Sequence, residues 1–222
     1  MIDRAEPAAR GRTAFIAAVW ACALAAALLV DAPLAAWIRH SGVEQAIRQP
    51  GPLHAAAAKI KLGGTYLTVL AAAAVIGAIH RLRWRAGVLV ALSGAAALVN
   101  SLLKWVVGRT RPFRLPEDIA QPAPFILAPF RGGLAGLLRD TNLSFPSGHA
   151  AVAFAAATAL AALWPRARAV FYALAALVAV ERVAENAHYA SDVVAAAALA
   201  VAATRIIVRV WRQSACTQHG QP

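Results

Sequence analysis

The chain has 222 residues, 60% of them hydrophobic, and a mean hydropathy of +0.60. This composition excludes an ordinary soluble domain and indicates a membrane protein. The formal net charge of +12 could suggest a nucleic-acid partner, but the basic residues form no single tract or face and lie instead at the ends of apolar segments. We therefore expect a surrounding lipid bilayer and no nucleic acid.

Six apolar segments approach the roughly 20 residues that a helix needs to cross a bilayer. They cover residues 13–31, 63–80, 86–107, 148–164, 168–186 and 188–208. The sequence predicts one all-α domain, residues 1–222, built as a bundle of six transmembrane helices. The first segment follows three arginines and could be a signal peptide, but the further spans favour a retained helix.

The orientation in the membrane is predicted from the charges of the loops. Of the 22 basic residues, half fall on each side of the membrane, but the side that holds the two termini has fewer acidic residues. We expect both termini in the cytoplasm. Residues 37–62 would then lie along the outer interface as short amphipathic pieces. Cys22 and Cys216 differ too much in membrane depth to predict a disulfide.

The longest connection, residues 108–145, is rich in proline and contains the apolar run FILAPF. A connection of this length is often a lid or a binding loop. An ordinary surface loop is the alternative.

The segment KWVVGRTRP ends the third predicted helix and carries three cations, Lys104, Arg109 and Arg111. Gly108 and Pro112 predict an early helix end, with Arg111 in an extended conformation before the proline. Lys104 and Arg111 could converge on one anion. Alternatively, these side chains could simply extend to the membrane interface.

The segment PSGH opens the fourth predicted helix. Ser147 is a favoured N-cap residue, and Gly148 allows a ligand to approach the backbone. The free N–H groups of such a helix end form an anion site. Helix capping explains Ser147 but gives no role to His149.

The segment ERVAENAHYASD leads into the sixth predicted helix. Asn186 could cap that helix, with His188 in its first turn and Asp192 four residues later on the same face. A carboxylate beside one ring nitrogen would leave the other free to attack an electrophile. Arg182 adds another cation, and together these segments predict a site for a phosphoryl group.

At these residues the sequence resembles the type 2 phosphatidic acid phosphatase superfamily, whose motifs are K-x6-RP, PSGH and SR-x5-H-x3-D. They read here as Lys104 with Arg111-Pro112, then Pro146 to His149, then Arg182, His188 and Asp192. Glu181 stands where the third motif usually has serine. Unless this carboxylate turns away or pairs with a cation, it would repel a phosphate.

The resemblance implies a metal-independent mechanism without cofactors. His188 would attack phosphorus and form a phosphohistidine, Asp192 would orient His188, and His149 would protonate the leaving oxygen and then help to activate water. The phosphoryl oxygens would be held by Lys104, Arg111, Ser147, Gly148 and Arg182. No carboxylate cluster of the kind that binds Mg²⁺ is visible in the sequence.

The function expected from this resemblance is hydrolysis of a lipid phosphate monoester or diphosphate at the outer face of a bacterial inner membrane. Candidate substrates are phosphatidic acid, phosphatidylglycerol phosphate, undecaprenyl diphosphate and lipid A 1-phosphate. A lipid phosphotransferase with the same intermediate, and a non-catalytic lipid-binding or transport protein, are the alternatives. The soluble vanadium haloperoxidases share the motifs, but six spans argue against them. The motif-bearing core would cover about residues 86–208. The sequence does not indicate whether the chain is a monomer or an oligomer.

Overall fold

The computed structural model describes residues 5–81, 84–116, 123–127 and 143–217. Six long helices dominate it, and each overlaps one predicted span, which confirms the all-α bundle. They are α1 (Ala5–His40), α4 (Tyr66–Ile79), α5 (Trp84–Val106), α7 (Gly148–Leu163), α8 (Arg168–Ala184) and α9 (Ala190–Thr217).

The helices differ in length from the predicted spans. By length and composition alone, two segments of the described chain are long and apolar enough to cross a membrane: Thr13–His40 in α1 and Ala190–Ser214 in α9. A third would be α3 (Pro52–Leu62) with α4, which pass together but are bent by 55°. Helices α7 and α8 have only 16 and 17 residues. Ser147 caps the start of α7 and Pro165 follows its end, and α8 is bounded by the turn after Ala184.

Helix α7 forms the centre of the bundle and packs against α5, α8 and α9. Its buried positions are mostly alanine, including Ala150, Ala151 and Ala155. Small side chains bring the neighbouring backbones close, as in other membrane bundles. Between α4 and α5 the approach is closer still, because a Cβ added at Gly87 would lie 2.7 Å from the carbonyl oxygen of Ala73.

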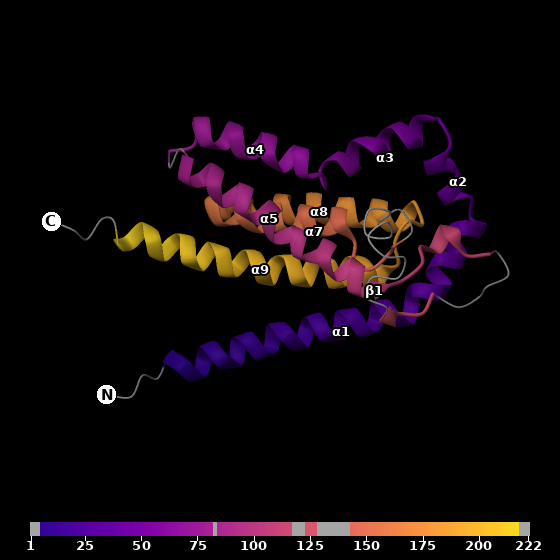
Figure 1. Cartoon of the computed structure of the whole chain (residues 1–222), viewed down its shortest axis with the longest axis horizontal. Helices are drawn as coiled ribbons and strands as arrows, with labels where there is room; N and C mark the ends of the chain where they lie inside the picture. Colours follow the sequence, from indigo (N-terminus) through magenta and orange to yellow (C-terminus); the bar gives the residue numbers. More distant parts are fainter. Residues whose placement is uncertain (1–4, 82–83, 117–122, 128–142, 218–222) are drawn as a thin grey trace.

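The path of the chain gathers the helix ends that carry the motifs at one end of the bundle (Figure 1). Helix α1 begins and α9 ends at the opposite end, while α5 ends, α7 begins, α8 ends and α9 begins near β1 (Val107–Gly108). Strand β1 pairs antiparallel with β2 (Ile126–Leu127). The short helices α2 (Val43–Arg48) and α3 follow α1 at this motif-bearing end, whereas residues 37–40 of the stretch predicted to lie at the interface belong to α1. Two 3-10 turns complete the described chain, η1 (Pro112–Arg114) and η3 (Pro165–Ala167).

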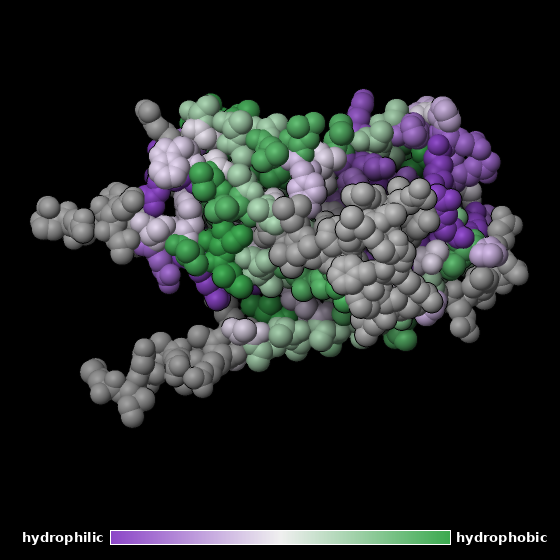
Figure 2. Space-filling model, viewed as in Figure 1, coloured by the Kyte–Doolittle hydropathy of each residue, from purple (hydrophilic) through white to green (hydrophobic). Residues whose placement is uncertain are grey.

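The surface follows the same division (Figure 2). Hydrophilic residues gather around α2 and α3, and hydrophobic residues cover the bodies of the helices. Exposed apolar side chains on those bodies include Leu67, Val75, Leu92 and Leu174. A soluble protein seldom exposes so much contiguous apolar surface, so these faces suit a lipid environment.

Candidate active site

Backbone hydrogen bonds join the three motif segments directly. The Ser144 N–H donates to the carbonyl of Arg109 at 2.7 Å, and the Ser147 N–H donates to the carbonyl of Asp192 at 3.2 Å. A third bond, from the Phe113 N–H to the Asn186 carbonyl at 3.2 Å, links the first segment to the last. The motif residues are therefore brought together, as their order along the chain suggested.

The first segment leaves the helix where the sequence predicted. Helix α5 ends at Val106, with Lys104 buried in its last turn. Arg111 has extended backbone angles, φ −68° and ψ 145°, and its Nε donates to the Leu143 carbonyl at 3.2 Å. The two cations thus stand on different pieces of backbone on either side of β1.

The second segment forms the N-terminus of α7, as predicted. Ser147 is its N-cap and accepts a hydrogen bond from the Ala150 N–H at 3.5 Å. A Cβ added at Gly148 would meet no heavy atom within 4 Å, so open space adjoins this helix end. That space, next to free N–H groups and the positive end of the helix dipole, suits an anion.

The third segment differs from the predicted arrangement at two residues. Helix α9 begins at Ala190, so His188 precedes the helix and does not lie in its first turn. Asn186 has a left-handed φ of 57° and its side-chain amide donates to Glu44 at 2.7 Å, so it does not cap α9. The turn over residues 185–189 is stabilised from α2, a contact that local sequence does not reveal.

His188 is buried and its Nδ1 lies 2.7 Å from the backbone carbonyl of Ser144. A carbonyl oxygen can only accept, so Nδ1 carries the hydrogen and Nε2 keeps its lone pair. The same Nδ1 is 3.8 Å from the nearer carboxylate oxygen of Asp192, which is beyond hydrogen-bond distance. The predicted neighbour is therefore present, but the carbonyl of Ser144 is the acceptor.

Asp192 acts on His188 through Ser144. Its Oδ2 accepts from the Ser144 hydroxyl and from the Tyr189 N–H at 2.8 Å, and its Oδ1 accepts from Arg109 at 2.6 Å. The carboxylate thus fixes the residue whose carbonyl orients the imidazole.

Arg109 joins the motif site to the first helix, a connection that the sequence reading missed. Its guanidinium pairs with Asp31 of α1 at 2.8 Å as well as with Asp192, and it donates to the Ser191 hydroxyl at 2.8 Å. The rings of Phe125 and Tyr189 stack on it, with centroids 4.3 and 3.9 Å from its central carbon. Asp31 itself was a signal, because a carboxylate within an apolar span is rarely there without a function.

Arg182 lies between two carboxylates. Its Nε donates to Glu181 at 2.6 Å, and one NH2 group contacts both Glu181 and Glu185. The residue that replaces the usual serine is therefore paired with a cation, which was one of the two ways to reconcile it with a phosphate site.

Electrostatics favour a neutral His188. Burial lowers its pKa from the ordinary 6.5 to about 4, and the Asp192 carboxylate offsets that shift only in part. The nearby cations of Arg111 and Lys104 lower the pKa further. At neutral pH the ring is thus uncharged, the form in which its nitrogen can act as a nucleophile.

A polar cavity of about 190 Å³ lies between α2, α3 and α8 at the same end of the bundle. Arg48, His54 and Lys61 line one part of it, and Glu181 and Glu185 line another. The cavity shares Glu181 with the Arg182 ion pair, so it adjoins the predicted phosphate site. No grouping of three potential metal-ligating side chains occurs among the described residues.

A family model described as "PAP2 superfamily" matches residues 83–215 of the chain. The chain belongs to the PAP2 superfamily. The matched range holds all three motifs, whereas Asp31 lies outside it. The apolar helices together with this membership make the chain a PAP2 membrane protein.

Individual similarities are more limited. The chain is 39% identical over 100 residues to a protein named lipid A 1-phosphatase from Rhizobium johnstonii, covering 45% of this chain and 37% of the relative. A protein of the same name from Rhizobium etli is 38% identical over 100 residues, covering 45% and 39%. The match thus spans less than two fifths of each curated relative.

Among solved structures, the chain is similar to a transmembrane PAP2 type phosphatidylglycerolphosphate phosphatase from Bacillus subtilis. That likeness has a TM-score of 0.49 and 21% identity, and it covers 86% of this chain and 96% of the other.

Proposed function

We propose that this PAP2 protein is a lipid phosphatase that works through a phosphohistidine on His188. The observation that carries the proposal is the state of that side chain: neutral, buried, and oriented by the Ser144 carbonyl so that Nε2 keeps its lone pair. The N-terminus of α7 and the cations of Lys104 and Arg111 belong to the same end of the bundle. Such an arrangement suits attack on a phosphoryl group.

In the first step, Nε2 of His188 forms a bond to phosphorus while the bond from phosphorus to the lipid oxygen breaks, and the protonated, cationic form of His149 gives its proton to that oxygen. In the second, a water gives a proton to His149 and attacks phosphorus, and the N–P bond breaks to release phosphate. Lys104, Arg111, Arg182, Ser147 and the Gly148 N–H would hold the phosphoryl oxygens throughout.

The buried acidic cluster would stabilise the intermediate. Phosphorylated His188 carries a positive charge on its ring, and two carboxylates, Asp31 and Asp192, share the single cation of Arg109. Within this cluster one negative charge is left in excess, and it offsets part of the repulsion that Arg111 and Lys104 exert on a charged ring. This excess favours the cationic phosphohistidine over the neutral ring.

The test is phosphate release by the purified protein from a panel of lipid phosphates. Wild type should release phosphate without an added acceptor, which separates hydrolysis from transfer. His188→Ala should lose at least about a thousand-fold in kcat, as removal of a covalent nucleophile does. His40→Ala, a matched substitution at an exposed histidine at the end of α1, should retain full activity. Equal turnover by His188→Ala and wild type would refute the hydrolase assignment.

Metal independence is tested in the same assay. Turnover should be unchanged after treatment with a chelator, because the proposed mechanism places all charge stabilisation on protein groups. A large loss that added metal restores would contradict it.

For the substrate, we propose a lipid whose phosphate is attached to a hydroxyl-rich headgroup of the lipid A 1-phosphate class. The polar cavity presents carboxylates that accept hydrogen bonds beside cations that donate them, which suits sugar hydroxyls. The two relatives named lipid A 1-phosphatase support the same class.

Headgroup selection predicts a split in the kinetic constants. Lys61→Ala should raise KM for a sugar-linked lipid phosphate and leave KM for a small soluble phosphate ester unchanged. If prenyl diphosphate were the better substrate, the proposed headgroup would be wrong while the hydrolase proposal would stand.

We also propose that the protein lies in a bacterial inner membrane with the site facing the periplasm.

A further inference from the structure

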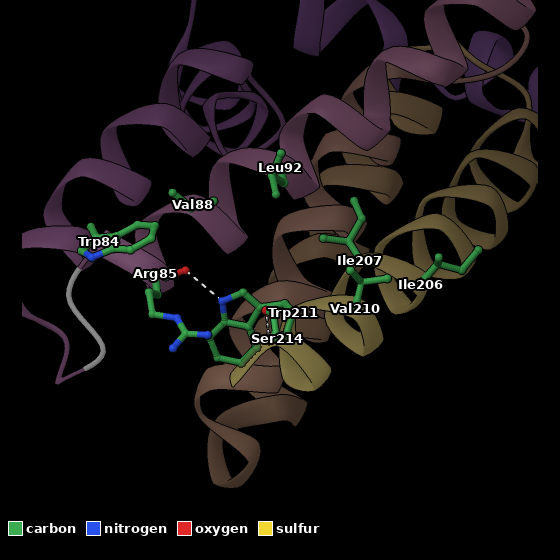
Figure 3. A pocket seen from close by; sticks show the side chains of 9 residues that line it. All are labelled: Trp84, Arg85, Val88, Leu92, Ile206, Ile207, Val210, Trp211 and Ser214. Carbon is green, nitrogen blue, oxygen red and sulfur yellow. Dashed lines mark hydrogen bonds between the residues drawn. The ribbon is translucent and has the colours of Figure 1, made fainter. Parts of the chain in front are cut away.

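An apolar groove lies at the end of the bundle opposite the candidate active site. It is formed by the beginning of α5 and the last turns of α9, with a volume of about 410 Å³. Figure 3 shows Val88 and Leu92 from α5 and, across the groove, Ile207 and Val210 from α9. This volume is in the range of ligand sites, which is roughly 300–1,000 Å³.

The groove is open outward at the depth of the apolar helix surface. Ile206 is 61% exposed and Val210 59% exposed, and both line it. In a membrane protein such a groove faces acyl chains. Its occupant must therefore be apolar along most of its length.

One end of the groove has the chemistry of a membrane interface. Trp84 and Trp211 line that end together with Arg85, and the Trp211 indole donates to the Arg85 carbonyl at 3.0 Å (Figure 3). Tryptophan is enriched at headgroup depth. The indole bond also ties α9 to α5, which holds the two walls of the groove in place.

Charge at this end is of one sign among the described side chains. Arg81, Arg209 and Arg212 are exposed at the same helix ends, and the partly buried Arg85 lines the groove itself. All five carboxylates of described side chains belong instead to the motif-bearing end: Asp31, Glu44, Glu181, Glu185 and Asp192. The groove thus combines an apolar channel with an arginine-rich mouth.

We propose that this groove binds one anionic phospholipid, with an acyl chain between α5 and α9 and its phosphate at Arg85. Basic pockets between transmembrane helices bind anionic headgroups in this way. The site belongs to the membrane leaflet opposite the candidate active site and is independent of the proposed phosphatase function. Occupancy would stabilise the far ends of two helices that carry Lys104 and Asp192 at their near ends.

The experiment is native mass spectrometry of the full chain in detergent, titrated with phosphatidylglycerol or with phosphatidylcholine of identical acyl chains. Wild type should retain one phosphatidylglycerol at concentrations where it retains no phosphatidylcholine. Arg85→Gln should weaken phosphatidylglycerol binding about five-fold, since one cation near the surface contributes about 1 kcal/mol. Arg166→Gln, an exposed arginine in η3 outside the groove, is the matched control and should bind as wild type does.

A second variant distinguishes lipid bound in this groove from lipid bound at the motif-bearing end, which could also attract an anionic lipid. Val88→Trp fills the groove and should abolish the bound phosphatidylglycerol while thermal denaturation shows a folded protein. Should that variant not fold, the Arg85→Gln and Arg166→Gln pair decides. Equal retention of the two lipids, or unchanged binding in Arg85→Gln, would overturn the proposal. So would a dimer that Val88→Trp dissociates, because the groove would then hold a second copy of the chain.

Discussion

The side chain of His188 illustrates how burial prepares a residue for chemistry. Enclosure lowers its pKa to about 4, and the carbonyl of Ser144 selects the tautomer. The proposed nucleophile is thereby neutral throughout the physiological pH range and needs no neighbouring base to remove a proton.

This pKa can be measured directly. With ¹³C-labelled histidine, the ring signal assigned to His188 by its loss in His188→Gln should titrate with a midpoint below pH 5. The sign follows from burial, which penalises the charged ring, so the neutral form persists as the pH falls through 6.5. A His188 midpoint near 6.5 would show that the ring is solvated.

The Asp31→Asn variant tests whether the charge of the buried acidic cluster contributes to catalysis. Replacing it by asparagine keeps its shape but leaves Arg109 and Asp192 as a neutral pair. The excess negative charge of this cluster is then lost, and we expect kcat to fall roughly ten-fold, about 1.4 kcal/mol, with little change in KM. Glu44→Gln removes a negative charge from α2 but keeps a side-chain oxygen that can accept from the Asn186 amide, so it should have a smaller effect on kcat. Full activity in Asp31→Asn would remove this residue from the proposed mechanism.

At the scale of elements, the break between α3 and α4 positions the start of α7. A Cβ added at Gly64 would lie 2.7 Å from the His149 carbonyl oxygen and 2.9 Å from the His149 Cβ. Real Cβ atoms do not approach backbone so closely, so this glycine allows a helix junction to rest against the residue proposed as general acid. The 55° bend is thus part of what places His149.

Gly64→Ala should therefore impair catalysis more than folding. The added methyl must displace either the α3–α4 junction or His149, and a small misplacement of a catalytic group can cost about a hundred-fold in rate. The matched control is Gly51→Ala in the same stretch, where the nearest atom to an added Cβ is 4.0 Å away. Phosphate-release kinetics and thermal denaturation of both variants give the comparison, and wild-type kcat in Gly64→Ala would contradict the assigned contact.

At the scale of the whole molecule, the helices run back and forth along the bundle. All three motifs therefore lie at one end, and the beginning of α1 and the end of α9 lie at the other (Figure 1). Single cysteines test which end faces out. In a background lacking Cys22 and Cys216, Pro116→Cys at the motif-bearing end should react with an impermeant reagent added outside intact cells. Arg81→Cys at the far end should react only after the membrane is opened. Both native residues are exposed, so the reverse pattern would invert the predicted orientation.

Local spacing predicted much of the site, because its parts are set by neighbours in sequence. Ser147 caps α7 and Arg111 is extended before proline for reasons that a few residues contain. The partners of Arg109 could not be predicted in this way. Asp31 is 78 residues away, and the acceptor for His188 is a backbone carbonyl 44 residues away, so only the packing of α1 and of the chain before α7 brings them together. The expected lid role of residues 108–145 falls largely outside the described residues.

The ion pair between Asp31 and Arg109 makes the first helix part of the candidate active site. The family match begins at residue 83, yet a fragment cut there would keep every motif and lose one of the two carboxylates around a buried guanidinium. Such a fragment would lack α1 to α4, and with them both Asp31 and the α3–α4 junction that lies against His149. If the proposed function holds, α1 contributes a side chain to the buried ion-pair cluster as well as a segment that can cross the membrane.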